Sequence, residues 1–509
     1  MRAREGEEAD ARQGSRKGKG GRLEKLSASS AGQAERPKVE GKARGGRTGA
    51  PQPAPVGKEG AEGVSWMGVA PARRAAFEVL LEVGQGRGHN DELLHSSRLG
   101  GLSGQDRNLA TALVMGVLRW QIALDARVRG LLDRPDQRMA DEVWVALRMG
   151  AFQLVHMDRI PAHAALSESV AMCRAAGQEH AAGMVNAVLR RLTREPAAGV
   201  KLYETTAAFA ERLGHPVWMV ERWVKTYGRA AAIAVCVADQ REPGRGSMFA
   251  VGADAPGDGE SLGGEDAADA EMSGRWGPEG FPIMDDGSRL VAEIAAAAAP
   301  GTPGRAVRVW DCCAAPGGKT TVLARRLKGA EILATDVSER RLRVMEERIG
   351  GLAASAGGGG PVRCLVSDAM ALPVEEGAFD LVVCDVPCSG TGTLSRNPEI
   401  RHRLRAEEIS RQAQRQKTIL AAAMKRAGVG GRVIYSTCSL EPEECEAVVA
   451  AIAGGWRQVP VNDFLEDLRA GGIVRENLNL TSMVRDQHLR TLPGVHACDG
   501  FYAVVLERS

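Results

Sequence analysis

Two cysteines in polar segments are the residues of this chain best suited to chemistry. The first segment reads Asp385-Val386-Pro387-Cys388-Ser389-Gly390-Thr391-Gly392, and the second reads Tyr435-Ser436-Thr437-Cys438-Ser439. Each follows a short apolar run with the pattern of a β-strand. A cysteine at a polar strand end is poorly placed for core packing. Core packing is instead the role that we expect for Cys173 and Cys236. The pair therefore predicts covalent catalysis by a thiol.

Covalent attack by a thiol suits the methylation of a pyrimidine at C5. Cytosine C5 is too weak a nucleophile to attack a methyl sulfonium, but thiolate addition at C6 gives C5 enamine character. A base then removes the C5 proton and β-elimination frees the enzyme, a stage at which a second thiol or a water can assist. Asp385 can hydrogen-bond the base edge. The candidate catalytic residues are Cys438, Cys388 and Asp385.

A small-residue turn that opens a helix offers a site for the cofactor. The segment Asp311–Thr320 follows the first strand candidate, and its small residues let the backbone approach a ligand. A P-loop would need glycine where Cys313 stands, and a G-x-G-x-x-G dinucleotide loop is absent, which leaves S-adenosylmethionine (SAM). The candidate cofactor-binding residues of the turn are Cys313, Ala314, Ala315, Pro316, Gly317, Gly318 and Lys319.

Two acidic residues follow the next strand candidates. Asp336 lies about twenty residues past the glycine turn, where a carboxylate can accept hydrogen bonds from both ribose hydroxyls. Asp368 follows the third strand candidate, where it can accept a hydrogen bond from the adenine amino group. The alternative role is a helix N-cap for Asp336 and a cap or a turn for Asp368. We expect both to bind the cofactor.

The elements that must position these residues alternate β-branched runs with helical patterns. The strand candidates are Val307–Trp310, Glu331–Thr335, Val362–Val366, Leu381–Cys384 and Arg432–Tyr435. This alternation predicts a parallel α/β sheet, here a Rossmann-like, SAM-dependent methyltransferase domain over residues 281–509. Ligands on such sheets bind beyond the carboxyl ends of the strands. The turn, the acidic residues and the cysteines all follow strand candidates, so we expect one site at that edge.

The residues before this domain have the apolar periodicity of helices, and they predict an all-α domain over residues 70–195. Ser103 stands three residues before Asp106 as a helix N-cap. A connecting helical subdomain is expected over residues 200–280, with a flexible acidic insertion. Residues 1–66 are rich in Gly, Lys and Arg and predict a disordered basic tail.

Composition limits the expected partners, metals and cellular location of the protein. Formal net charge is only +2, so a nucleic-acid partner must be met by a local basic face. Ten cysteines without a signal peptide indicate a reducing compartment, and we expect a cytoplasmic location. The cysteines lack the paired C-x₂-C spacing of a zinc site, so no metal is expected. No apolar run long enough to span a bilayer is apparent, so we expect no membrane partner.

Together these motifs resemble a known family. Pro-Cys-Ser-Gly-Thr-Gly at 387–392 with Thr-Cys-Ser at 437–439 is similar to the NOP/Sun family of RNA cytosine-C5 methyltransferases. The segments Gln105–Leu109, Gly116–Trp120 and Val185–Leu192 resemble the NusB-like helical RNA-binding domain. The combination is similar to the bacterial RsmB (Sun) enzymes, which methylate one cytosine of small-subunit (16S) ribosomal RNA.

The resemblance implies a role for each site residue. The nucleophile of the family is the cysteine of the Thr-Cys-Ser motif, which falls on Cys438, and Cys388 helps product release. DNA cytosine methyltransferases use the Pro-Cys thiol as nucleophile, so the second motif implies an RNA substrate and not DNA. The cofactor loop of the family falls on Cys313–Lys319, and its further SAM-contacting carboxylates fall on Asp336, Asp368 and Asp385.

The resemblance also reaches the C-terminus, where Arg490–His496 and Asp499–Tyr502 predict a final hairpin strand. RNA phosphates are expected to meet arginines, although a solvated helix face is the alternative for each. The candidates in the helical domain are Arg107, Arg119, Arg190 and Arg191, and those beyond the Pro-Cys loop are Arg396 and Arg401–Arg405.

Two other functions remain open from the sequence. The same chemistry can act on transfer RNA or on another ribosomal cytosine, because related enzymes share both cysteine motifs. A non-enzymatic NusB-like RNA-binding factor is the other alternative, and the intact cysteines, Asp385 and glycine turn argue against it. We expect a monomer.

Overall fold

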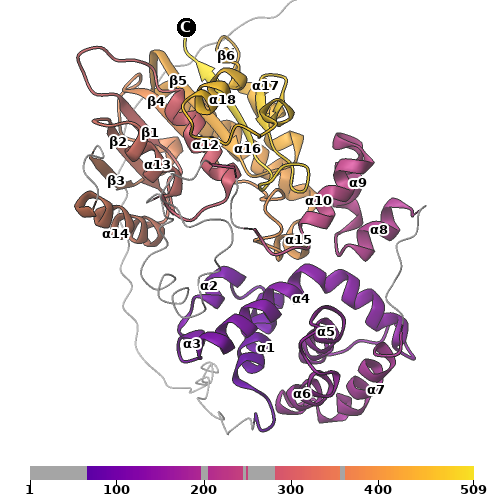
Figure 1. Ribbon diagram of the computed structural model, residues 1–509. Coiled ribbons are helices and arrows are strands. Elements are labelled where there is room, and N and C mark those ends of the chain that lie inside the picture. The colour runs from indigo at the N-terminus through magenta and orange to yellow at the C-terminus, as the bar shows by residue number, and fades with distance from the viewer. Residues whose placement is uncertain (1–65, 196–203, 245–247, 250–280, 356–360) are drawn as a thin grey trace, which may run out of the picture. The chain divides into compact units, whose positions relative to one another are not determined.

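The computed structural model describes residues 66–195, 204–244, 248–249, 281–355 and 361–509. The predicted basic tail and acidic insertion lie outside these residues, apart from the very end of the tail. Helices occupy the described residues before about 244, and an α/β sheet follows them (Figure 1). This order confirms the predicted fold class, a helical region followed by a Rossmann-like domain.

The first helical region is built around an apolar core. Its elements are α1 (Pro71–Gly84), α2 (Asn90–Leu94), α3 (Ser97–Gly100), α4 (Gly104–Leu131), α5 (Asp141–His156), α6 (Ala162–Ala175), η1 (Glu179–Ala181) and α7 (Ala182–Leu192). Leu113, Leu147 and Leu189 are fully buried between these helices. The Ser103 side chain accepts a hydrogen bond from the amide of Asp106 and caps α4, as predicted.

Helix α4 is the single helix of the described ranges that is long and apolar enough to cross a membrane by length and composition. Leu113, Val117 and Leu124 of this helix are buried in the helical core, against α1 and α5. The apolar stripe of α4 is therefore accounted for by packing within the protein.

A second group of helices covers part of the sheet domain. It consists of α8 (Thr206–Arg212), α9 (Val217–Tyr227) and α10 (Arg229–Ala238). Trp223 and Val235 lie in a small core that also contains Leu394, Leu440 and Leu492 from the loops at the strand ends. These helices, predicted as a connecting subdomain, thus support the loops that follow the strands.

Nine strands form one sheet in the described residues, in the order β3-β2-β1-β4-β5-β9-β8-β7, with β6 also paired to β9. The strands are β1 (Arg308–Asp311), β2 (Glu331–Asp336), β3 (Val362–Val366), β4 (Phe379–Asp385), β5 (Ala427–Thr437), β6 (Arg457–Val459), β7 (Val484–Arg485), β8 (His488–Arg490) and β9 (Tyr502–Glu507). Strands β1 to β5 are parallel, and β9 runs antiparallel to β5. The strand order reverses between β1 and β4, which is where such sheets bind ligands.

Helices cover both faces of this sheet. One face carries α12 (Asp286–Ala297), α13 (Gly318–Arg326), α14 (Glu339–Ser355) and α18 (Val461–Ala470), and the other carries α16 (Ala406–Arg426) and α17 (Glu446–Ile452). Alternate residues of one strand serve the two cores: Val383 of β4 packs toward α12 and Val382 toward α16. Short helices complete the domain: η2 (Ala369–Ala371), α15 (Ile400–Arg403), η3 (Pro442–Glu444) and η4 (Leu480–Met483).

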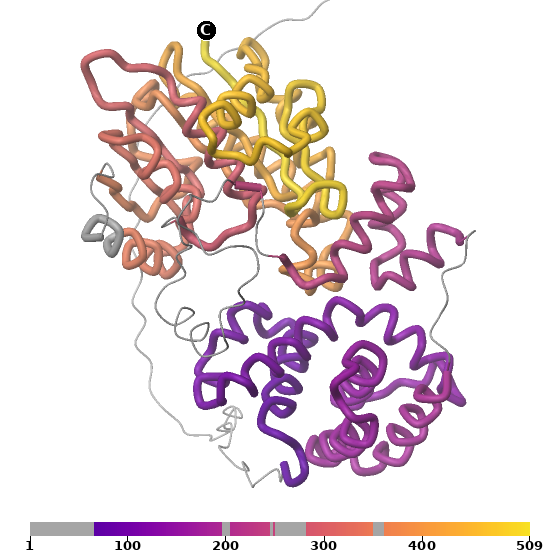
Figure 2. The backbone as a smooth tube through the Cα atoms, viewed as in Figure 1, coloured from indigo at the N-terminus to yellow at the C-terminus, as the bar shows by residue number. Residues whose placement is uncertain are grey.

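The predicted strands agree with the observed ones except at their ends. The largest difference is β5, which begins at Ala427 and not at Arg432, because the glycine-rich start still pairs with β4. The predicted final hairpin is confirmed, since β8 pairs with β9. Figure 2 traces β9, in yellow, back into the sheet beside β5, in orange.

Candidate active site

The two candidate cysteines lie side by side. Cys388 follows β4 and Cys438 follows β5, and these neighbouring parallel strands end at the same edge of the sheet. The Sγ atoms are 3.2 Å apart, within hydrogen-bonding distance for thiols. Both side chains are half-buried. The loops therefore present two thiols as a pair, open in part to solvent.

A glycine allows the two loops to approach this closely. The Gly392 amide donates to the carbonyl oxygen of Cys438 at 2.9 Å, and the Gly500 amide donates to the Gly392 carbonyl at 2.8 Å. A Cβ atom at residue 392 would overlap both the Gly500 and the Cys438 carbonyl groups. Glycine at this position is thus required by close backbone packing.

The pairing gives the two thiols different electrostatic environments. The hydrogen bond with Cys438 is the largest cause that raises the pKa of Cys388 well above its ordinary value, and burial and the negative charge of Cys438 add to it. Cys388 therefore keeps its proton and can donate it in a hydrogen bond to a Cys438 thiolate. The contact therefore places a protonated Cys388 thiol directly beside Cys438.

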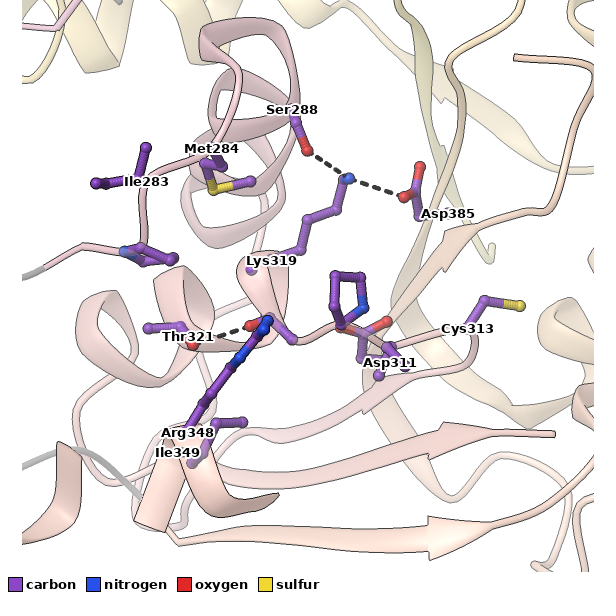
Figure 3. A pocket seen from close by; sticks show the side chains of 16 residues that line it. Ile283, Met284, Ser288, Asp311, Cys313, Lys319, Thr321, Arg348, Ile349 and Asp385 are labelled. Atoms are coloured by element: carbon purple, nitrogen blue, oxygen red, sulfur yellow. Dashed lines mark hydrogen bonds and ion pairs between the residues drawn. The ribbon is translucent and has the colours of Figure 1, made fainter. Parts of the chain in front are cut away.

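Asp385 connects the cysteines to the cofactor turn. Its Oδ2 atom pairs with Nζ of Lys319 at 2.7 Å, and its Oδ1 atom accepts a hydrogen bond from Oγ of Ser436 at 2.7 Å. Lys319 also donates to Oγ of Ser288 at 2.8 Å, and Figure 3 shows its side chain reaching between Ser288 and Asp385. Burial works against the charge of Lys319, but the charge and hydrogen bond of Asp385, with a smaller contribution from Cys438, raise its pKa. Lys319 is thus an ammonium close to the thiols.

The glycine turn borders a cavity of about 440 Å³. The residues of the turn from Cys313 to Lys319 line it together with Asp385, whereas Cys388 and Cys438 are not among the lining residues. The lining residues that the sequence analysis did not assign include Pro282, Ile283, Met284, Ser288, Asp311 and Arg348. Figure 3 shows the Arg348 side chain directed toward the turn.

The chemical groups around this cavity fit SAM. Gly317 has φ +98° and begins α13 without a side-chain cap, so the first amides of the helix suit a carboxylate. A Cβ atom at residue 317 would come within 2.7 Å of Cγ of Met345. Carboxylates of Asp311 and Asp385 on the cavity wall suit the positive amine and sulfonium groups. Burial raises the pKa of Asp311 to about 6, although the hydrogen bond from Thr320 opposes this shift.

Asp336 and Asp368 do not line the cavity. Asp336 lies at the end of β2, where its side chain accepts hydrogen bonds from the amides of Ala315 at 3.3 Å and Ser338 at 2.8 Å. Asp368 is exposed and caps η2 by accepting from the amide of Met370 at 2.9 Å. Asp368 therefore performs the capping role that the sequence left as its alternative, whereas Asp336 closes a turn before α14, which begins at Glu339, and does not cap that helix. Their predicted contacts with ribose and adenine remain predictions.

Several arginines expected to meet RNA have internal partners. Arg119 is buried, and its Nε and Nη2 atoms donate to the Ser395 carbonyl at 3.1 and 2.8 Å, so the phosphate prediction is wrong for this residue. Arg401 is buried as well and donates to the carbonyls of Arg119 and Gly214. Arg396 forms ion pairs with Asp285 and Asp499.

Other arginines remain available. Arg190 and Arg191 are exposed on α7, where Arg191 forms a surface ion pair with Asp133 at 3.2 Å. Arg405 is also exposed, and Arg107 is half-buried beside the Leu102 carbonyl. Arg119 lies in the apolar helix α4, whereas Arg401 lies in a polar segment like the exposed arginines, so no single sequence signal separates the buried arginines from the exposed ones.

Known proteins match both parts of the chain. The family described as 16S rRNA methyltransferase RsmB/F matches residues 302–507, and the NusB family matches residues 70–194. The chain is 30% identical over 475 residues to the ribosomal RNA small subunit methyltransferase B of Xanthomonas campestris pv. campestris, covering 87% of this chain and 98% of that protein. It is 29% identical over 458 residues to the probable ribosomal RNA small subunit methyltransferase B of Bacillus subtilis (strain 168), covering 84% and 97%.

A solved structure shares the fold across most of the chain. The crystal structure of PH0851 aligns with a TM-score of 0.62 and 19% sequence identity, covering 86% of this chain and 99% of that chain. The shared architecture therefore extends over the helical regions as well as the sheet.

Proposed function

Since the chain belongs to the RsmB/F family of SAM-dependent ribosomal RNA methyltransferases, we propose that it methylates C5 of a cytosine in 16S ribosomal RNA. The observation that supports this most directly is the thiol pair, with 3.2 Å between the Sγ atoms of Cys388 and Cys438, joined to the cofactor cavity through Asp385 and Lys319. A nucleophile, a proton donor and a cofactor site thus share one edge of the sheet.

Cys438 is the proposed nucleophile. Its thiolate forms a bond from Sγ to cytosine C6, and the π electrons of the C5–C6 bond move so that C5 becomes nucleophilic. The Lys319 ammonium lies near Cys438, which contributes to its raised pKa. SAM supplies the methyl group on an electrophilic sulfonium. Asp385 holds the base by accepting from its exocyclic amine, and the turn from Cys313 to Lys319 holds the cofactor, with Asp336 and Asp368 toward its nucleoside end.

Release requires the C5 proton to leave and the C6–S bond to break. A water molecule acting as the base takes the C5 proton, the C5–H electron pair re-forms the C5–C6 double bond, and the C6–S pair returns to Cys438 as a thiolate. Cys388, which keeps its proton, donates a hydrogen bond to that leaving thiolate. Its proposed role is therefore in release and not in attack.

The helical domain over residues 70–195 is proposed to hold the RNA strand. The match to the NusB family supports RNA binding by this domain, and the exposed Arg190 and Arg191 supply positive charge for phosphates. A paired cytosine would have to leave its stack to reach the half-buried thiols. Phosphate contacts away from the thiols keep the strand bound meanwhile.

Covalent trapping tests the proposal. The protein is incubated with SAM and small-subunit RNA carrying 5-fluorocytosine, and adducts are separated on a denaturing gel. Fluorine cannot leave as a proton, so β-elimination is blocked and the adduct persists. Wild type and Cys388→Ala should form the adduct, and Cys438→Ala should form none.

Other outcomes reject parts of the proposal. Loss of the adduct in Cys388→Ala alone would exchange the roles of the two thiols. Trapping on transfer RNA and not on small-subunit RNA would keep the chemistry and change the substrate. Absence of any adduct with wild type on either RNA would reject covalent C5 methylation.

A further inference from the structure

Each cysteine of the active site is followed by a serine, and both serines donate to one carboxylate. Ser389 follows Cys388, and Ser439 follows Cys438. The two hydroxyl oxygens are 3.0 Å apart, and both donate to Oε2 of Glu444, from Ser439 at 2.5 Å. Both serines and Glu444 are buried. One carboxylate thus joins the two cysteine loops directly behind the thiols.

The second oxygen of Glu444 extends this connection. Its Oε1 atom accepts from the Ser389 amide at 2.9 Å and from Nε2 of Gln416 at 3.0 Å. Gln416 also donates to the Pro387 carbonyl at 3.0 Å, so it holds the residue before Cys388. Tyr435 fixes the backbone of Glu444 by donating from its hydroxyl to the Glu444 carbonyl at 2.6 Å. The carboxylate accepts four hydrogen bonds and is held in place itself.

We propose that Glu444 is a positioning residue that sets the distance between the two thiols during the reaction. The inference rests on the proposed covalent function. A side chain that holds the residue after each cysteine limits how far either Sγ atom can move. Thiol attack and thiol-assisted release both need placement within roughly 0.5 Å, which single loops do not supply.

The charge of Glu444 has a second effect on the same pair. The hydrogen bond with Cys438 is the main cause of the raised pKa of Cys388, and the negative charge of Glu444 raises it further. Glu444 therefore helps to keep Cys388 protonated, while it does not line the cofactor cavity. Both the position and the charge of Glu444 thus favour attack by Cys438 and assistance of release by Cys388.

The first experiment measures adduct formation in Glu444→Gln. A glutamine keeps the size of the side chain but directs an amide N–H₂ group toward donors. At saturating SAM and 5-fluorocytosine RNA, the rate of adduct formation should fall about 10- to 100-fold, because loops that lose their common acceptor no longer hold the thiols in place. Dissociation constants for RNA and SAM should not change. Glu443→Gln is the matched control, because Glu443 is only half-buried and pairs with Arg222.

The second experiment measures the rate of disulfide formation between the two thiols, which depends on their distance, in the absence of RNA and SAM. Diamide takes two electrons and two protons from Cys388 and Cys438, becomes the hydrazine and leaves a disulfide. Mass spectrometry follows the linked peptide over time. Wild type and Glu443→Gln should cross-link rapidly, and Glu444→Gln should cross-link several-fold more slowly. A merely stabilising role for Glu444 would not change this rate in folded protein.

Two further variants keep the test decisive. If Glu444→Gln does not fold, as judged by circular dichroism, Ser439→Ala removes one donor and should slow both reactions to a smaller extent, as should Ser389→Ala. Trapping of wild type with unchanged rates in all folded variants would overturn the inference. Failure to trap wild type would instead reject the proposed function, and the diamide rates would then still show whether Glu444 sets the spacing.

Discussion

The helical region over residues 66–195 and the carboxyl edge of the sheet bury different kinds of side chain. Leu113, Leu147 and Leu189 represent a helical core that is mostly apolar. The buried polar side chains of this region are Arg73, Asn90, Arg119, Gln153 and Ser169. The edge of the sheet buries Asp311, Ser389, Thr391, Ser439 and Glu444, among other polar residues. An apolar core tolerates substitutions of similar volume, whereas a buried polar network depends on each of its partners.

This difference separates stability from catalysis. A substitution in the helical core should lower stability and leave the thiol chemistry of the folded protein intact. A substitution at the sheet edge should change the chemistry out of proportion to its effect on stability. The following variants test that separation, from the largest expected change in stability to the smallest.

Leu147→Ala should destabilise the protein by about 2–5 kcal/mol, because it leaves a cavity at a fully buried site. Urea unfolding measures the loss. At a temperature where the variant is folded, its rate of diamide cross-linking should equal that of wild type. Leu81→Ala is the control, since Leu81 is half-buried and should cost less. A slowed cross-linking rate in folded Leu147→Ala would contradict the separation.

Gly392→Ala should destabilise the protein by about 1–3 kcal/mol, because its Cβ atom overlaps backbone of Cys438 and Gly500. The relief of that overlap moves the Cys438 loop, so adduct formation should fall at least 10-fold even in folded protein. Trapping rates and urea unfolding together measure both effects. Gly454→Ala introduces the same methyl group into open space and should leave both unchanged.

Arg191→Ala should change stability by less than about 1 kcal/mol, because its ion pair with Asp133 is exposed. If Arg191 meets a phosphate, RNA affinity should fall and its dependence on salt should weaken by a slope of about 1. Binding isotherms at several salt concentrations measure this. Arg174→Ala, which removes another exposed ion pair of the helical region, should not alter the slope.

Much of the sheet was predictable because β-branched runs are local signals. β3 agrees with its predicted range, and β1, β2 and β4 differ from theirs by one or two residues at either end. The predicted range for β5 was too short because glycines have low strand propensity. The pairing of Phe379 with Ala427 in the structure reveals the extension. The cysteines and the glycine turn were found because their residue types are unusual at strand ends.

The rest depended on contacts between distant residues. Glu444 stands in an acidic run, Glu441-Pro442-Glu443-Glu444, that suggests exposure, yet it is buried against two loops. The sequence signal available for a buried partner of the two loops was the serine that follows each active-site cysteine. Arg119 and Arg401 likewise look like surface cations, and only their carbonyl partners reveal that they are internal. Burial of a single charged residue depends on its partners in the fold, which periodicity does not report.

Asp385 has a consequence for how two ligands affect each other. One of its oxygens binds Lys319 on the cavity wall, and the other binds Ser436, two residues before Cys438. Occupants of the cavity and of the thiol site therefore share one carboxylate. Thermodynamic linkage is reciprocal, so each occupant changes the affinity of the other by the same factor. A substitution of Asp385 that changes this coupling should therefore change it by the same factor whichever ligand is measured.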